Sequence, residues 1–120
     1  RDAAANSRNI PALRVLADTL AKGLRSSDVV ARYGGDEFVV LLPETGPQAA
    51  FEKLEQLRLS VARAEFAIPR PDLTAQITLS AGIACLPDDG TDPVELLEVA
   101  DRRLFEAKDG GRNCVVGPQD

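Results

Sequence analysis

The chain of 120 residues is 44% hydrophobic and 28% charged, proportions typical of a single globular domain and not of a disordered segment. No hydrophobic run approaches the roughly 18–20 residues that span a bilayer, and no secretory signal opens the chain, so we expect a cytoplasmic protein without membrane contact. The net charge of −5 argues against nucleic-acid binding but still allows a local basic pocket for a phosphorylated small molecule.

The first predicted element is a helix over residues 11–24, where hydrophobic residues recur at helical spacing and a proline stands in the first turn. Two β-rich runs follow at 29–33 and 38–42, on either side of the Gly-Gly-Asp-Glu segment 34–37. Because paired glycines supply the positive φ of a tight turn, these runs predict a β-hairpin.

A second helix is predicted over residues 45–64, and a proline-containing loop follows it at 67–73. Alternating hydrophobic residues then predict a strand over 75–85. A third helix is expected over 92–110, with aspartate as its N-cap and glycine at its end, before a short strand at 114–116. The order α-β-β-α-β-α-β predicts an α/β fold in which helices pack on a sheet.

The chain contains no histidine, which excludes histidine-based catalysis and the common zinc sites. Cys85 and Cys114 lie in hydrophobic segments, as reduced thiols of cytosolic proteins do. Asp36 and Glu37 are adjacent carboxylates on the glycine turn, and together they can hold a divalent cation beside a nucleotide phosphate. The alternative is a polar hairpin tip that merely faces water, and composition alone favours that alternative.

The segment 32–43, RYGGDEFVVLLP, closely resembles the signature of GGDEF domains, the diguanylate cyclase family. Segment 80–84 resembles a later strand of that family, and segments 100–108 and 111–113 resemble its C-terminal helix and the turn after it. The matches run in order over about residues 12–116. This resemblance implies a nucleotidyl-cyclase-like sheet of the palm or ferredoxin-like type, flanked by helices.

The resemblance also implies a reaction between two GTP-loaded domains that face each other in a homodimer. The 3′-hydroxyl of each GTP attacks the α-phosphate of the other, which yields cyclic di-GMP and two pyrophosphates. By position, Asp36 and Glu37 would be catalytic and would bind Mg²⁺ or Mn²⁺. Gly34 and Gly35 would let the GTP phosphates lie against the turn.

Two basic residues near the C-terminus complete the implied substrate site. Lys108 and Arg112 would contact the β- and γ-phosphates of GTP, one as a point charge and the other as a forked donor. Without the resemblance, their favourable interaction with a helix C-terminus would be the simpler interpretation.

Arg25 and Asp28 resemble the inhibitory RxxD site of the family, which binds cyclic di-GMP itself. Arginine can fork onto guanine and phosphate, and aspartate can accept from guanine nitrogens. The pair could instead be a simple ion pair at the end of a helix. Arg58 is a further basic candidate for this site.

The chain departs from the family pattern at its N-terminal end, where the usual first strand and helix are absent. The positions that normally hold guanine would be Arg1 and Ile10, although Asn6 or Asn9 could serve if the loop register differs. Either the chain is part of a longer protein, or its guanine pocket has degenerated. We therefore expect little or no cyclase activity from this chain alone.

Three roles follow from the resemblance. The first is an enzyme module that is active in a full-length dimer together with sensory or regulatory domains. The second is a degenerate receptor for cyclic di-GMP, and the third is a regulatory dimerisation module. In each case we expect one GGDEF domain over residues 1–120, with 117–120 as a flexible tail.

Overall fold

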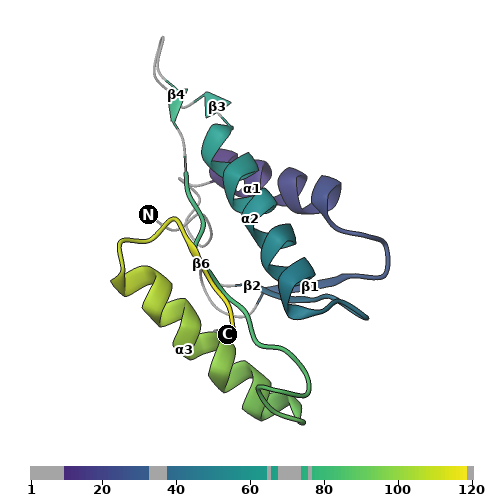
Figure 1. Ribbon diagram of the computed structural model, residues 1–120. Helices are drawn as coiled ribbons and strands as arrows, with labels where there is room; N and C mark the ends of the chain where they lie inside the picture. The colour runs from purple at the N-terminus through teal and green to yellow at the C-terminus, as the bar shows by residue number, and fades with distance from the viewer. Residues whose placement is uncertain (1–9, 33–37, 65, 68–73, 76, 119–120) are drawn as a thin grey trace. The chain divides into compact units, whose positions relative to one another are not determined.

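The computed structural model describes residues 10–32, 38–64, 66–67, 74–75 and 77–118 (Figure 1). Its elements follow the order α1, β1, β2, α2, β3, β4, β5, α3 and β6. The chain divides into two compact units. The first consists of Arg1–Pro43 with Leu59–Thr78, and the second consists of Glu44–Arg58 with Leu79–Asp120.

In the first unit, helix α1 (Ile10–Gly23) leads into an antiparallel strand pair. β1 (Val29–Arg32) and β2 (Phe38–Leu41) are rich in valine, whose branched side chain suits an extended backbone. The register of the pair runs from Val29 opposite Leu41 to Arg32 opposite Phe38. The predicted first helix and the two arms of the predicted hairpin are therefore confirmed.

The first unit also contains a short strand pair that the sequence did not predict. β3 (Phe66–Ala67) and β4 (Thr74–Ala75) pair antiparallel on either side of the proline-containing loop. Strands of two residues are too short to show an alternating pattern, which explains why this pairing was missed.

The predicted continuous strand over 75–85 is wrong. Its residues contribute to two separate pairings, because β4 pairs with β3 whereas β5 (Ala81–Gly82) pairs in parallel with β6 (Val115–Val116). Residues 77–80 between these strands belong to no strand.

Helix α2 (Pro47–Arg63) confirms the second predicted helix. Its residues before Leu59 belong to the second unit and its last turn belongs to the first. Ala50, Leu57 and Val61 are its buried positions, and their spacing puts them on one face of the helix.

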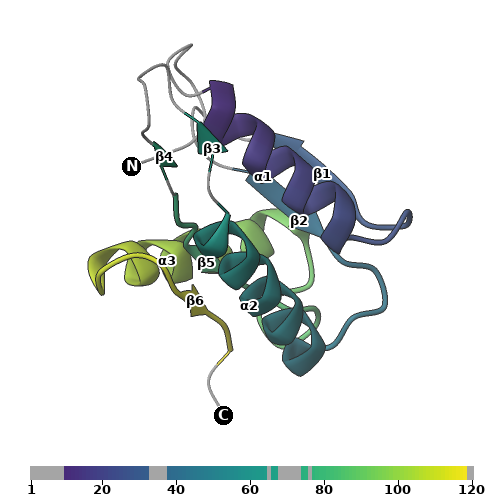
Figure 2. The ribbon, with the colours of Figure 1, turned by 90° about the horizontal axis from the view of Figure 1, so that it is seen from above.

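In the second unit, helix α3 (Pro93–Asp109) packs against β5 and β6, as Figure 2 shows from above. The packing is close because Gly82 has no side chain. A Cβ on that residue would lie 2.3 Å from both the carbonyl oxygen of Ala100 and the amide nitrogen of Leu104. Ala107 on the same helix is fully buried, so small residues set the distance between helix and strands.

The ends of α3 confirm the capping signals in the sequence. Asp92 is the N-cap, and its side chain accepts a hydrogen bond of 3.0 Å from the amide of Glu95. Glu95 in turn accepts from the amide of Thr91. At the other end, the amide of Gly110 donates to the carbonyl of Glu106, and Gly111 follows with a φ of 115°.

An ion pair joins α3 to the loop after β5. Arg103 donates to both carboxylate oxygens of Asp89, at 2.7 and 2.9 Å, and also to the carbonyl of Ile83. The amide of Cys85 donates to the same carboxylate. The hydrogen bonds from Arg103 hold the pKa of Asp89 below its usual value. Within the described part of the chain, no helix is both long and hydrophobic enough to cross a membrane.

Candidate functional site

The tip of the β1–β2 hairpin carries the residues expected to bind metal and the substrate phosphates. Gly34, Gly35, Asp36 and Glu37 lie outside the described residues. The residues on either side of this part of the chain are described, and Arg32 of β1 pairs with Phe38 of β2. Among the residues that the structure does describe, no group of three or more carboxylates and thiols is placed to hold a metal ion.

The other expected substrate-binding residues, Lys108 and Arg112, lie at the C-terminal end of α3. Lys108 is half-buried in the last turn of the helix, and Arg112 is exposed in the turn that follows. The amide of Arg112 donates to the carbonyl of Ala107, and the amide of Gly111 donates to that of Lys108. These bonds fold the chain back over the helix end, so both basic residues belong to one local structure.

The turn over residues 111–113 has an uncommon backbone. Gly111, Arg112 and Asn113 all have positive φ, at 115°, 64° and 53°. Glycine adopts such angles freely, asparagine is tolerated, and arginine is disfavoured because of its Cβ. A turn of this kind persists when its surroundings hold it in place.

Two side chains from elsewhere in the chain bond to this turn, and a third side chain bonds to one of them. The hydroxyl of Ser80 accepts from the amide of Asn113 at 2.9 Å. Arg58 of α2 donates to the side-chain oxygen of Asn113 at 3.0 Å and to its carbonyl at 3.3 Å. Glu55 accepts from Arg58 at 2.7 and 2.8 Å, and these bonds lower the pKa of Glu55 and raise that of Arg58.

The structure therefore places Arg58 at the turn after α3. The sequence analysis named Arg58 as a candidate for the inhibitory site and did not predict its contact with Asn113. The partners stand 55 residues apart in the chain, and no local spacing signals such a contact.

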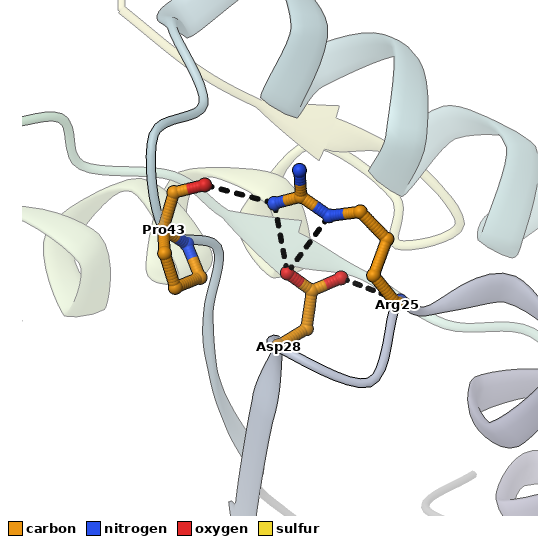
Figure 3. Close-up of polar contacts among 3 residues, drawn as sticks. All are labelled: Arg25, Asp28 and Pro43. Carbon is orange, nitrogen blue, oxygen red and sulfur yellow. Dashed lines mark hydrogen bonds and ion pairs between the residues drawn. The ribbon is translucent and has the colours of Figure 1, made fainter.

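Arg25 and Asp28, the expected inhibitory residues, form a compact pair just before β1 (Figure 3). The carboxylate accepts from the backbone amide of Arg25 at 2.8 Å and from its guanidinium at 3.0 and 3.3 Å. The Asp28 side chain is 0% exposed, whereas that of Arg25 is 51% exposed. The buried carboxylate is thus hydrogen-bonded, whereas the Arg25 side chain is half-exposed.

The guanidinium of Arg25 also reaches the end of the hairpin. Its Nη2 donates to the carbonyl of Pro43 at 2.8 Å, two residues beyond the last residue of β2. The pair therefore connects the turn before β1 with the segment after β2, as the dashed lines in Figure 3 show.

Comparison with known families gives one match over most of the chain. The model of the family described as "Diguanylate cyclase, GGDEF domain" matches residues 11–114. The response regulator PleD of Caulobacter vibrioides is 37% identical over 105 residues, which are 88% of this chain and 23% of PleD. The diguanylate cyclase DgcP of Pseudomonas aeruginosa is 42% identical over 102 residues, 84% of this chain and 15% of that protein. The chain thus spans a quarter or less of the length of these relatives.

Solved structures agree with the family match. The active GGEEF domain of a diguanylate cyclase from Vibrio cholerae superimposes with a TM-score of 0.83 at 27% identity, covering 96% of this chain and 72% of that one. The GGDEF domain of DgcB from Caulobacter crescentus, solved in complex with c-di-GMP, gives 0.77 at 28% identity over 88% and 61%. The expected α/β fold of the nucleotidyl-cyclase type is confirmed.

Proposed function

Because the chain belongs to the GGDEF domain family of diguanylate cyclases, we propose that it serves, within its full-length protein, to condense two GTP molecules into cyclic di-GMP. The match of the family model over residues 11–114, with Asp36 and Glu37 inside it, carries this proposal. The reaction would run in a homodimer whose active-site faces meet, since each GTP is both nucleophile and electrophile. The proposal places the domain in the cytoplasm, under sensory or regulatory domains elsewhere in the full-length protein.

Each candidate residue has a chemical task in this reaction. Gly34 and Gly35 leave the backbone bare where the phosphates approach. Lys108 and Arg112 bind the β- and γ-phosphates of GTP and neutralise their charge, one as a point charge and the other as a forked donor. Their shared position at the end of α3 supports this role, because the backbone bonds of the turn fix them together.

The donor set of Asp36 and Glu37 fits a hard divalent cation. Two adjacent carboxylates supply the oxygen ligands that Mg²⁺ and Mn²⁺ prefer. When bound, the cation supplies charge that stabilises the phosphate oxygens and lowers the pKa of the attacking hydroxyl. The carboxylates themselves orient that hydroxyl and add negative charge beside it.

We further propose that cyclic di-GMP, the product, binds at Arg25 and Asp28 and inhibits the enzyme. The half-exposed guanidinium of Arg25 has the forked donors that recognise phosphate or a guanine edge. The complex of DgcB with c-di-GMP supports this class of ligand.

A second candidate function is a receptor or a regulatory dimerisation module that makes no product. Ile10, the first residue of α1, favours it, because it stands where the family carries a guanine-binding aspartate and its side chain cannot accept a hydrogen bond. The two candidates differ in whether the full-length protein turns over GTP.

The deciding experiment follows cyclic di-GMP formation by the full-length protein with GTP and Mg²⁺. We expect product from the parent and a loss of at least about a hundredfold in Glu37→Gln, which removes the charge but keeps the shape. Glu98→Gln, an exposed position on α3, is the matched control and should retain full activity. A parent that binds cyclic di-GMP but forms none would establish the receptor instead.

A further inference from the structure

The turn that carries Arg112 has a backbone conformation that is disfavoured at the arginine itself. Arg112 has a φ of 64° and Asn113 a φ of 53°, and neither residue is glycine. A residue with a Cβ rarely adopts such backbone angles unless other contacts hold it there. The direction of the Arg112 side chain therefore also depends on contacts that residues outside the turn make with it.

Arg58 makes the outside contacts that come from α2. Its Nη1 bonds the side-chain oxygen and the carbonyl of Asn113, which directly follows Arg112. The Arg58 side chain is 15% exposed, whereas Asn113 is an exposed residue, so these bonds lie at the surface. A contact to both the main chain and the side chain of one residue restrains its rotation as well as its position.

Arg58 is itself held in one orientation. Glu55, one helical turn earlier, accepts from its Nε and Nη2 in a two-point contact. This arrangement leaves Nη1 directed at the turn, and the rigid α2 backbone carries both residues. Glu55, Arg58 and Asn113 thus form a chain of hydrogen bonds from a helix to the turn, within one compact unit.

We propose that Arg58 is a positioning residue for GTP: it fixes the backbone of the turn 111–113 so that Arg112 meets the β- and γ-phosphates. This inference rests on the proposed function of Arg112. Arg58 touches no phosphate itself, and its effect passes through Asn113. Its removal should therefore weaken the binding of nucleotides that carry these phosphates and leave the others unaffected.

The test is a double-mutant cycle on the full-length protein. We expect Arg58→Ala to raise KM for GTP about tenfold with kcat changed less than about twofold, and Arg112→Ala to raise KM at least as much. The double variant should be no worse than Arg112→Ala, because a positioning residue has nothing left to position. If the increase in KM of the double variant were the product of the increases in the two single variants, the proposal would be overturned. Arg63→Ala, at an exposed arginine of the same helix, should match the parent.

A second readout separates positioning from general destabilisation and from failure of the proposed function. Calorimetry would compare GMP with a GTP analogue whose α–β bridge cannot be cleaved. Arg58→Ala should bind the analogue about tenfold more weakly and GMP as the parent does. Equal loss for both ligands, or no loss for either, would overturn the proposal. A parent that binds neither nucleotide would refute the proposed function itself, and this inference with it.

A gentler variant covers the case in which Arg58→Ala unfolds. Asn113→Gly keeps a residue that adopts positive φ and keeps the carbonyl, but it removes the side-chain oxygen that Arg58 contacts. We expect it to raise KM for GTP by about threefold with an unchanged melting temperature. A KM equal to that of the parent would show that the Arg58 contact to this side chain is dispensable and would count against the proposal.

Discussion

Asp89 shows how one carboxylate joins separate pieces of the fold. It accepts two hydrogen bonds from Arg103 and one from the amide of Cys85, and its side chain is 12% exposed. Water is therefore a poor substitute for these partners, and the charge of each group is satisfied by the other. The hydrogen bonds from Arg103 lower the pKa of Asp89, so the folded protein binds the proton less readily than the unfolded chain does.

Asp89→Asn should lower the free energy of unfolding by about 2–3 kcal/mol at neutral pH, because the amide leaves the Arg103 charge without its partner. Asp89 has a lowered folded pKa, so its contribution is present above the unfolded pKa and is lost as pH falls through the folded one. The difference between parent and variant should thus hold at pH 7 and shrink below about pH 4. Urea unfolding across this range measures it, with the exposed Glu98→Gln as control. A difference that does not change with pH would contradict the ionic explanation.

At the scale of elements, the distance between α3 and β5 is set by residues with little or no side chain. Gly82 lies against the backbone of α3, and Ala107 is fully buried in the same helix. The close packing matters for function because α3 ends at Lys108 and leads into the turn of Arg112. Any shift of the helix along the strands would move both basic residues at once.

Gly82→Ala should destabilise the protein by about 3 kcal/mol or more, because the added methyl would meet helix backbone, which cannot rotate away. The contacts would be 2.3 Å to Ala100 and Leu104 and 2.8 Å to Arg103. Gly46→Ala is the matched control, since a Cβ there meets nothing within 4 Å. Thermal unfolding of both variants measures this effect, and Gly82→Ala should have the lower melting temperature. Equal melting temperatures would mean that α3 does not approach β5 so closely.

Across the whole molecule, periodic patterns predicted more than isolated residues did. The three helices and the two strands of the hairpin follow from hydrophobic spacing, and all of them were confirmed, whereas the turn glycines lie outside the described residues. The strand over 75–85 was wrong and the β3–β4 pair was missed, because two-residue strands are defined by partners and not by their own sequence. The Arg58–Asn113 contact was missed for the same reason: its partners are 55 residues apart.

Arg25 and Asp28, in contrast, form the ion pair that the sequence analysis gave as an alternative, because residues three apart in a tight turn are neighbours. A further hydrogen bond connects the pair to the hairpin, because the Arg25 guanidinium donates to the carbonyl of Pro43, which follows β2. Strand β2 begins next to the Gly-Gly-Asp-Glu segment and ends near Pro43. A ligand bound to the Arg25 guanidinium would therefore lie beside the end of β2, the strand that follows the proposed catalytic carboxylates.

This arrangement predicts that inhibition by product can be removed without loss of the reaction. In the full-length protein, Arg25→Ala should raise the concentration of cyclic di-GMP needed for half-inhibition by at least about tenfold, because the forked donor is lost. Its uninhibited initial rate should stay within about twofold of the parent. Initial rates of pyrophosphate release at increasing cyclic di-GMP give both values. Ser26→Ala, an exposed change in the same turn, is the control and should be inhibited like the parent. If Arg25→Ala were inhibited as strongly as the parent, the product would have to bind elsewhere, and the Arg25–Asp28 pair would be only a structural brace between the turn and the hairpin.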